Sequence, residues 1–133
     1  MSVIAVRAAL ETALNAMSPA LATAWENASF TPVNGTPYQA VHILFAQPSN
    51  HEFGSRHQEQ GFMQVKLMYP QSVGTAVISA RAEMLRTTFA RGNTFLSGEV
   101  TTMVTRTAEI SSGTVEGDRF AIAVRIPFNA NIN

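Results

Sequence analysis

The chain contains no cysteine, and this absence removes several kinds of chemistry at once. Disulfide bonds, a thiolate nucleophile, and zinc or iron–sulfur sites held by cysteine are all excluded. Folding therefore needs no oxidising compartment. With 133 residues, of which 46% are hydrophobic, the chain is long enough for one domain over residues 1–133. A domain of this size buries roughly two-thirds of its unfolded surface.

Charge is also scarce. Only 14% of the residues are charged, nine basic residues balance nine acidic ones, and Lys66 is the single lysine. A nucleic-acid-binding protein needs a cluster of basic side chains to neutralise phosphates, and the sequence contains no such cluster. We therefore expect no specific nucleic-acid binding. A sparsely charged surface slightly favours a protein that buries part of its exterior against partners, because fewer charges must be desolvated.

Long hydrophobic runs are missing as well. No stretch approaches the 18 or so uninterrupted apolar residues that a membrane-spanning helix requires. The first residues, Met1 to Arg7, lack the basic region and long apolar core of a secretory signal. We expect a soluble protein that is made in a cytoplasm and does not bind membranes.

The hydrophobic periodicity predicts an α+β fold. We expect a mainly antiparallel sheet of about five strands with two helices packed on one face. The predicted order is helix, three strands, helix, two strands (α-β-β-β-α-β-β). Helices are predicted over residues 3–17 and 72–89, and strands over 21–27, 38–46, 62–69, 98–110 and 119–128.

The last predicted strand has the clearest alternation in the chain. Its apolar side chains alternate strictly with a second set made of two arginines and two alanines: Arg119, Ala121, Ala123 and Arg125. A strand with one face this apolar lies on the core. The opposite face is small enough for another surface to lie flat on it.

Two segments show no periodic pattern of apolar residues. Residues 47–61 are polar, and a structureless loop of this length in a compact domain is usually functional or mobile. Part of it can extend the flanking strands into a protruding hairpin. We expect residues 47–61 to be mobile and residues 129–133 to form a frayed tail.

Catalytic motifs are absent. The histidines His42, His51 and His57 do not have the spacing of metal ligands, and the carboxylates form no recognisable pair. There is no phosphate-binding loop and no nucleophile elbow. We expect no enzyme, no metal and no cofactor. The alternative from another class is a small-molecule-binding module or enzyme that uses the three histidines.

Several short motifs at the turns and at the ends of the predicted helices and strands resemble those of a known family. These are Gly35-Thr36-Pro37-Tyr38, the loop end from Arg56 to Gly61, Tyr69-Pro70, Gly74, and Phe89-Ala90-Arg91-Gly92. With these features the chain, from about Val3 to Phe128, resembles the tail terminators of long-tailed bacteriophages, small minor tail proteins also encoded by prophages. The resemblance implies an α+β fold.

The resemblance also implies a function. Such proteins form a hexameric ring on the head-proximal end of the tail tube, end polymerisation of the tube protein and present a surface for joining to the head. The implied partners are copies of the chain, the tail tube protein and the head–tail connector protein. The implied location is the virion tail, after synthesis in the bacterial cytoplasm. Related neck and tail-completion proteins share this architecture and remain an alternative.

Five charged residues are candidates for the interface between subunits or with the tube. On the predicted sheet and loop surface we expect exposed side chains that pair across subunits. Arg81 lies on the apolar face of the second helix, where its head either stays in water or contacts another subunit. The candidates are Arg56, Glu59, Arg81, Arg106 and Arg125.

Overall fold

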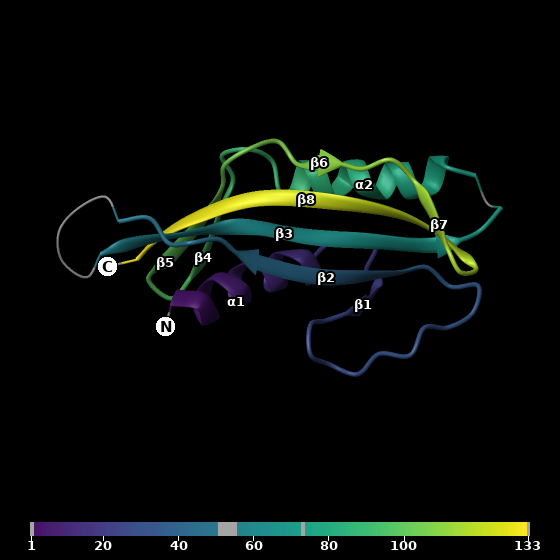
Figure 1. Cartoon of the computed structure of the whole chain (residues 1–133), viewed down its shortest axis with the longest axis horizontal. Coiled ribbons are helices and arrows are strands. Elements are labelled where there is room, and N and C mark those ends of the chain that lie inside the picture. Colours follow the sequence, from purple (N-terminus) through teal and green to yellow (C-terminus); the bar gives the residue numbers. More distant parts are fainter. Residues whose placement is uncertain (1, 51–55, 73, 133) are drawn as a thin grey trace.

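The computed structural model describes residues 2–50, 56–72 and 74–132. It contains two helices and eight strands (Figure 1). In chain order these are α1 (Ser2–Asn15), β1 (Ala22–Ala24), β2 (Tyr38–Phe45), β3 (His57–Pro70), α2 (Ala76–Thr88), β4 (Thr94–Ser97), β5 (Val100–Val104), β6 (Glu109–Ile110), β7 (Thr114–Glu116) and β8 (Arg119–Ile132). None of the described helices is long and apolar enough to cross a membrane.

All eight strands belong to one sheet with the order β1-β2-β3-β8-β5-β4, and β6 and β7 also pair with β8. Every pairing is antiparallel except that of β1 with β2. The expected sheet of about five strands was therefore too small. Residues 98–110 form two strands rather than one, and β4 and β7 were not predicted. Strands of two to four residues are too short to establish an alternating pattern.

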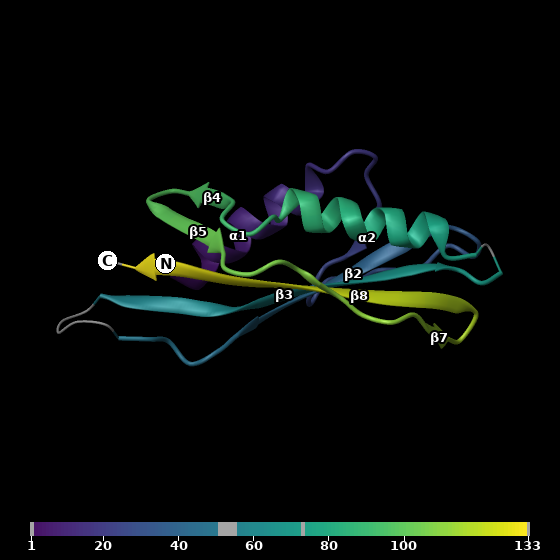
Figure 2. The same cartoon turned by 90° about the horizontal axis from the view of Figure 1, so that it is seen from above.

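Both helices lie on the same face of the sheet, as predicted (Figure 2). Within the helix predicted over residues 3–17, α1 buries Val6, Leu10 and Leu14. In α2, the buried apolar positions are Ile78, Ala82 and Leu85. This helix begins at Ala76 and not near the predicted start at residue 72, because Ser72 and Gly74 have positive φ angles of 67° and 78°. Those angles lie outside the right-handed helical region.

The helix-facing side of the two longest strands forms the centre of the core. Residues directly opposite one another in β3 and β8 share a face, so each pair is buried together. These pairs are Met63–Ile126, Val65–Val124 and Leu67–Ile122. The alternation predicted for the last strand is confirmed.

The strands β3 and β8 are longer than predicted, and they pair over their full length from His57–Ile132 to Pro70–Arg119. The frayed tail expected over residues 129–133 is wrong for the described part, because Ala130 is buried opposite Glu59. Residues 57–61, expected in a loop, belong to β3, and Ser49 forms a bridge with Gln58. The hairpin extension is thus the observed form, and residues 51–55 lie outside the described part of the chain.

One glycine is required where β2 meets β3. A Cβ atom on Gly61 would lie 2.0 Å from the carbonyl oxygen of Leu44. Any side chain at this position would therefore push the two strands apart.

A buried arginine fastens the long connection between β1 and β2 to the sheet. The Arg119 guanidinium donates hydrogen bonds to the carbonyl oxygens of Thr36 at 2.6 Å, Val33 at 2.7 Å and Met68 at 3.4 Å. It also lies over the ring of Tyr38, 4.8 Å from the centroid. The charge is therefore surrounded by electron-rich groups although only 5% of the residue is exposed.

The edge of β2 beyond the short strand β1 is covered by an ion pair. Glu26 Oε1 accepts a hydrogen bond from the Ile43 amide at 2.6 Å and another from Arg7 Nη1 at 2.9 Å. Arg7 in turn donates to the Ile43 carbonyl at 3.5 Å. Side chains thus occupy the backbone positions that a neighbouring strand would use. Charged groups at such positions oppose pairing with other chains.

This arrangement predicts a loss of stability in acid. The pKa of the Glu26 carboxyl lies below its ordinary value of 4.5, because burial opposes the charge but the Ile43 amide and Arg7 outweigh that effect. The contribution of Glu26 is therefore fully present above about pH 4.5 and is lost as the pH falls through the folded-state pKa. Glu26→Gln should lower the free energy of unfolding at pH 7. Near pH 3 the free energy of unfolding of the variant should approach that of the wild type, as measured by urea titration.

The exposed Glu83 on α2, changed to Gln, controls for the loss of one carboxylate. An equal difference between wild type and Glu26→Gln at both pH values would show that the carboxylate is not stabilised by its partners.

Candidate functional site

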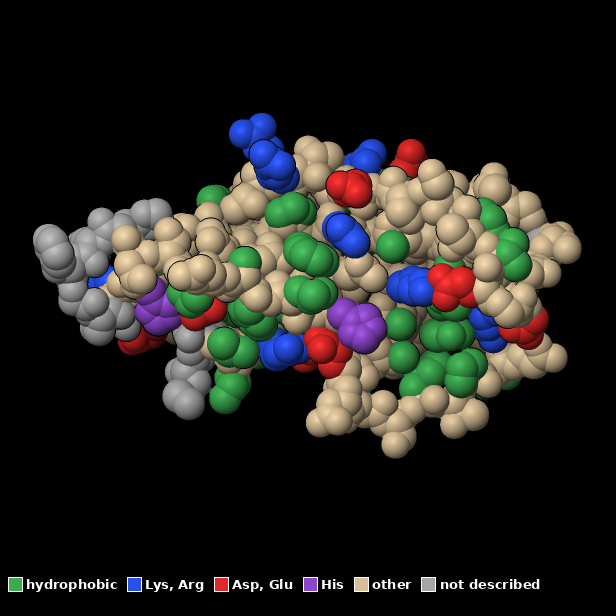
Figure 3. Space-filling view, viewed as in Figure 1, with side chains coloured by type: hydrophobic (Ala, Val, Ile, Leu, Met, Phe, Trp, Pro, Cys, Tyr) green, Lys and Arg blue, Asp and Glu red, His purple; other side chains and the backbone are tan. Residues whose placement is uncertain are grey.

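The sheet face opposite the helices, here called the open face, carries a row of apolar side chains. Strand register places Leu44, Phe62 and Pro127 side by side on β2, β3 and β8. Leu44 is 47% exposed, and the other two are half-buried. Hydrophobic side chains accordingly cross the middle of this face in the space-filling view (Figure 3). No described helix covers them.

A polar row lies directly beside the apolar one. The same register aligns His42, Gln64, Arg125 and Glu109 across β2, β3, β8 and β6. Arg125 Nε donates to Gln64 Oε1 at 3.2 Å, and the Arg125 guanidinium lies 5.1 Å from the centroid of the Phe62 ring. Arg125 is therefore oriented by its neighbours while its residue stays exposed.

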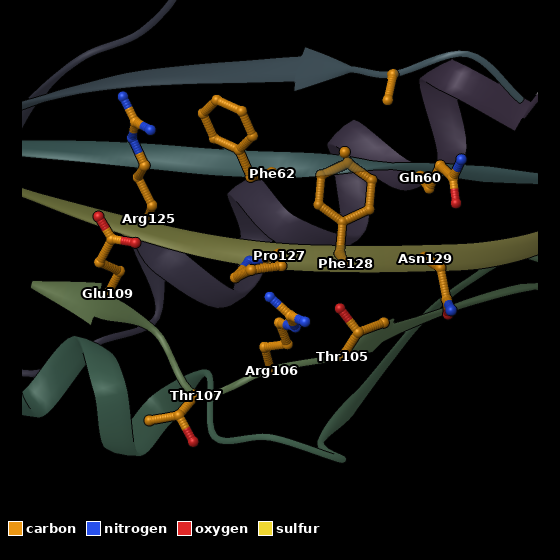
Figure 4. Close-up of a pocket in the computed structure, with 12 residues that line it drawn as sticks. Gln60, Phe62, Thr105, Arg106, Thr107, Glu109, Arg125, Pro127, Phe128 and Asn129 are labelled. Carbon is orange, nitrogen blue, oxygen red and sulfur yellow. The ribbon is translucent and has the colours of Figure 1, made fainter.

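A groove of about 640 Å³ opens where the two rows meet the linker between β5 and β6. The Thr105 amide donates to the Pro127 carbonyl at 3.1 Å and so places Arg106 beside β8. Figure 4 shows β8 running between this linker and the strand that carries Phe62. The groove combines an apolar floor with charged walls. Its lining residues are Ala46, Gln60, Gly61, Phe62, Thr105, Arg106, Thr107, Glu109, Arg125, Pro127, Phe128 and Asn129.

Two of the five candidate residues meet in this groove. Arg106 and Arg125 both line it, and both are exposed. Arg56 is exposed just before β3. The expectation that Glu59 is exposed is wrong, because this residue is 7% exposed and its carboxylate lies 3.0 Å from His57 Nε2. Its place opposite the buried Ala130 turns it away from the open face.

Arg81 is buried, contrary to the expectation of a head in water. Only 4% of the residue is exposed, and Nη1 donates to the carbonyl oxygen of Pro19. Nε and Nη2 have no acceptor among the described residues. Burial lowers the pKa of the guanidinium, against the opposing influence of Tyr69, and burial raises the pKa of the Tyr69 hydroxyl. The side chain is therefore not available on the exterior of a single folded chain.

The histidines do not converge on one site. His42 projects from the open face, 3.9 Å from Glu26, whereas His57 lies on the helix-facing side next to Glu59. His51 lies outside the described residues. Among the described residues, no group of three or more His, Asp and Glu side chains could hold a metal ion. The arrangement gives no support to chemistry shared by the three histidines.

Sequence reasoning did not identify Leu44, Phe62, Glu109 and Pro127 as parts of the site. Leu44 and Phe62 were predicted to lie in strands, and alternation alone puts them on the faces opposite Ile43 and Met63. Their meeting with Pro127 depends on the pairing of β3 with both β2 and β8. Nothing in the local sequence specifies that pairing.

The comparisons with known proteins point in one direction. The family model described as phage tail terminator protein matches residues 5–128. No curated protein matches the chain. Seven chains in solved structures match. One of them aligns over 100% of this chain and 98% of its own length, with a TM-score of 0.82 and 24% identity. At that identity the likeness shows a shared fold.

The two buried arginines allow a test of how hydrogen-bond acceptors around a buried charge affect the stability of the fold. Arg119 has three carbonyl acceptors and an aromatic ring, whereas Arg81 has one acceptor among the described residues. Arg119→Met should therefore lower the free energy of unfolding by roughly 1–3 kcal/mol, because it removes several charge-assisted hydrogen bonds. Arg81→Met should change it by less than about 1 kcal/mol or increase it, because an apolar side chain replaces a poorly compensated buried charge.

Urea unfolding of the two variants, which make the same substitution at similar burial, provides the comparison. A larger loss for Arg81→Met than for Arg119→Met would contradict this account.

Proposed function

Because this chain belongs to the phage tail terminator protein family, a family of structural proteins of the phage tail, we propose that it caps the finished tail tube. The family match confirms the resemblance seen in the sequence and supports a structural role in phage tail assembly. In the proposed function, six copies form a ring on the head-proximal end of the tube. The ring ends polymerisation of the tube protein and offers its other side to the head–tail connector protein.

The observation that carries the proposal beyond the family is the open face. It presents an uncovered apolar row of Leu44, Phe62 and Pro127 beside the exposed Arg106 and Arg125. Interfaces typically combine an apolar centre with a polar rim, and arginine is among the residues enriched in them. This surface therefore supports contact with neighbouring copies or with the tube better than it supports a catalytic role.

Overall charge fits the proposed position in the particle. Double-stranded DNA has to pass through the ring, and a strongly basic lining would hold its phosphates. The chain has no net charge at neutral pH, with nine basic and nine acidic residues. Its location in the virion tail follows from the same proposal, after synthesis in the host cytoplasm.

Tail length gives a direct test. In a phage that lacks this gene, wild-type protein should restore tails of normal length, whereas Arg106→Glu combined with Arg125→Glu should give overlong tails. Loss of an interfacial arginine that pairs across subunits costs about 2–5 kcal/mol at each contact, and the loss recurs around a closed ring. Tail lengths are measured by electron microscopy.

Two controls separate the proposal from its alternatives. Arg91→Glu changes an exposed arginine that does not line the groove, and it should leave tail length normal. His42→Ala, His51→Ala and His57→Ala, made singly, should also give normal tails, since the proposal assigns no histidine a role. Normal tails from the double arginine variant would remove the open-face assignment. Failure of the wild-type gene to restore tail length would overturn the terminator function.

A further inference from the structure

A closed ring of identical subunits, joined head to tail, needs two different surfaces on each copy that fit one another. The groove on the open face is one surface with no described segment covering it. Its floor is formed by Phe62 and Pro127, and Arg106 on its wall is exposed and has no ion pair with any described residue. A fitting partner therefore offers a small apolar side chain together with a carboxylate.

The turn that joins β7 to β8 offers that combination. We use the name β7–β8 turn for residues 115–118, which are the last two residues of β7 and the two that follow them. Val115 is 64% exposed, and the exposed Asp118 forms no ion pair with any described residue. An exposed aliphatic side chain and an uncompensated carboxylate thus lie three residues apart.

The same turn is held in place by its neighbours. Lys66 Nζ donates to Glu116 Oε1 at 2.7 Å, and Gln71 Nε2 donates to the Gly117 carbonyl at 3.1 Å. Gly117 has a φ angle of 61°, which is the left-handed conformation that a tight turn uses and that glycine adopts readily. A fixed protrusion loses little conformational entropy on binding.

The turn and the groove lie at different ends of β8. The turn precedes Arg119, the first residue of β8, and the groove is lined by Arg125, Pro127, Phe128 and Asn129 nearer the other end of that strand. Figure 1 shows β7 at the end of β8 away from the C-terminus. At about 3.3 Å per residue, Asp118 and Pro127 are roughly 25–30 Å apart along the strand. One copy cannot place its own turn in its own groove, and each copy offers both surfaces.

We propose that the β7–β8 turn of one copy enters the open-face groove of the next copy. Val115 packs against Phe62 and Pro127, and Asp118 pairs with Arg106. The contact joins two different surfaces, so repeating it from one copy to the next produces a ring where the rotation between copies closes. The inference rests on the proposed ring and specifies the contact that builds it.

The turn between β4 and β5 has similar chemistry but a different place. Leu96 is 70% exposed and Glu99 is exposed. However, β5 pairs with β8 at residues 128–130, so this hairpin adjoins the groove of its own chain. It does not provide a second surface at the opposite end of the molecule, and it therefore serves as the matched control.

Charge exchange tests the contact. Arg106→Asp and Asp118→Arg should each weaken self-association at least about tenfold, because each places like charges opposite one another. The double variant Arg106→Asp/Asp118→Arg should restore association to within about threefold of wild type. An equal mixture of the two single variants should also associate, as a ring in which they alternate. Glu99→Arg should associate as the wild type does.

Sedimentation over a concentration series measures association, and electron microscopy of tube ends incubated with each protein shows whether rings form. Both exchanged residues are exposed, and a thermal unfolding profile confirms that each variant is folded. Val115→Ser, which introduces no charge, gives a second variant that should weaken association and leave folding unchanged.

The outcomes are distinguishable. Wild-type rings that persist in both single variants and in Val115→Ser would overturn the contact and leave the proposed function standing. Wild-type association that stops at a dimer would also overturn the head-to-tail contact. Absence of wild-type rings on tube ends, with tail length uncontrolled, would overturn the proposed function and this contact with it.

Discussion

The pairing of β3 with β8 determines the arrangement of nearly everything else in this protein. The two strands are matched residue by residue from His57–Ile132 to Pro70–Arg119. Because side chains alternate across a strand, this register assigns every second residue of both strands to the core and the rest to the open face. A shift by one residue would place Val65 and Leu67 in water and Gln64 and Lys66 under the helices. Burial on one face therefore fixes the composition of the other.

The sequence was most informative where a pattern was long. The strand β8 and the helix α1 were predicted correctly as elements, because the periodicity of each extends over enough residues to define a period. The short strands β4 and β7 were not predicted, because β4 forms by pairing with β5 and β7 by pairing with β8. The end of β8 was missed for a related reason. Its asparagine-rich residues look like a tail, and the pairing with β3 and β5 extends the strand.

The residues of the candidate site could be predicted from the sequence only in part, because their positions depend on contacts between distant segments. Arg106 and Arg125 could be named from the sequence as dispersed arginines, but their meeting in one groove depends on Thr105 joining Pro127 and on β8 joining β3. Glu59 was chosen as an exposed loop residue and Arg81 as a charge on the apolar face of a helix, and both are buried. A charged side chain is usually exposed, so its type alone does not reveal the exceptions. Burial follows from contacts with segments far away in the sequence, such as Pro19 for Arg81.

The parts of the sheet that are covered and those that are left open indicate which surface contacts other molecules. Helices cover one face, and the Glu26–Arg7 pair occupies the free backbone positions of β2 at Ile43. Protection of an edge strand disfavours open-ended addition of strands, which has no built-in limit to the number of copies. The open face instead offers side chains of particular shape and charge, where specificity depends on a matching partner. A protein proposed to end the growth of a polymer needs such a limit, and blocking the β2 edge while leaving the open face available supplies one.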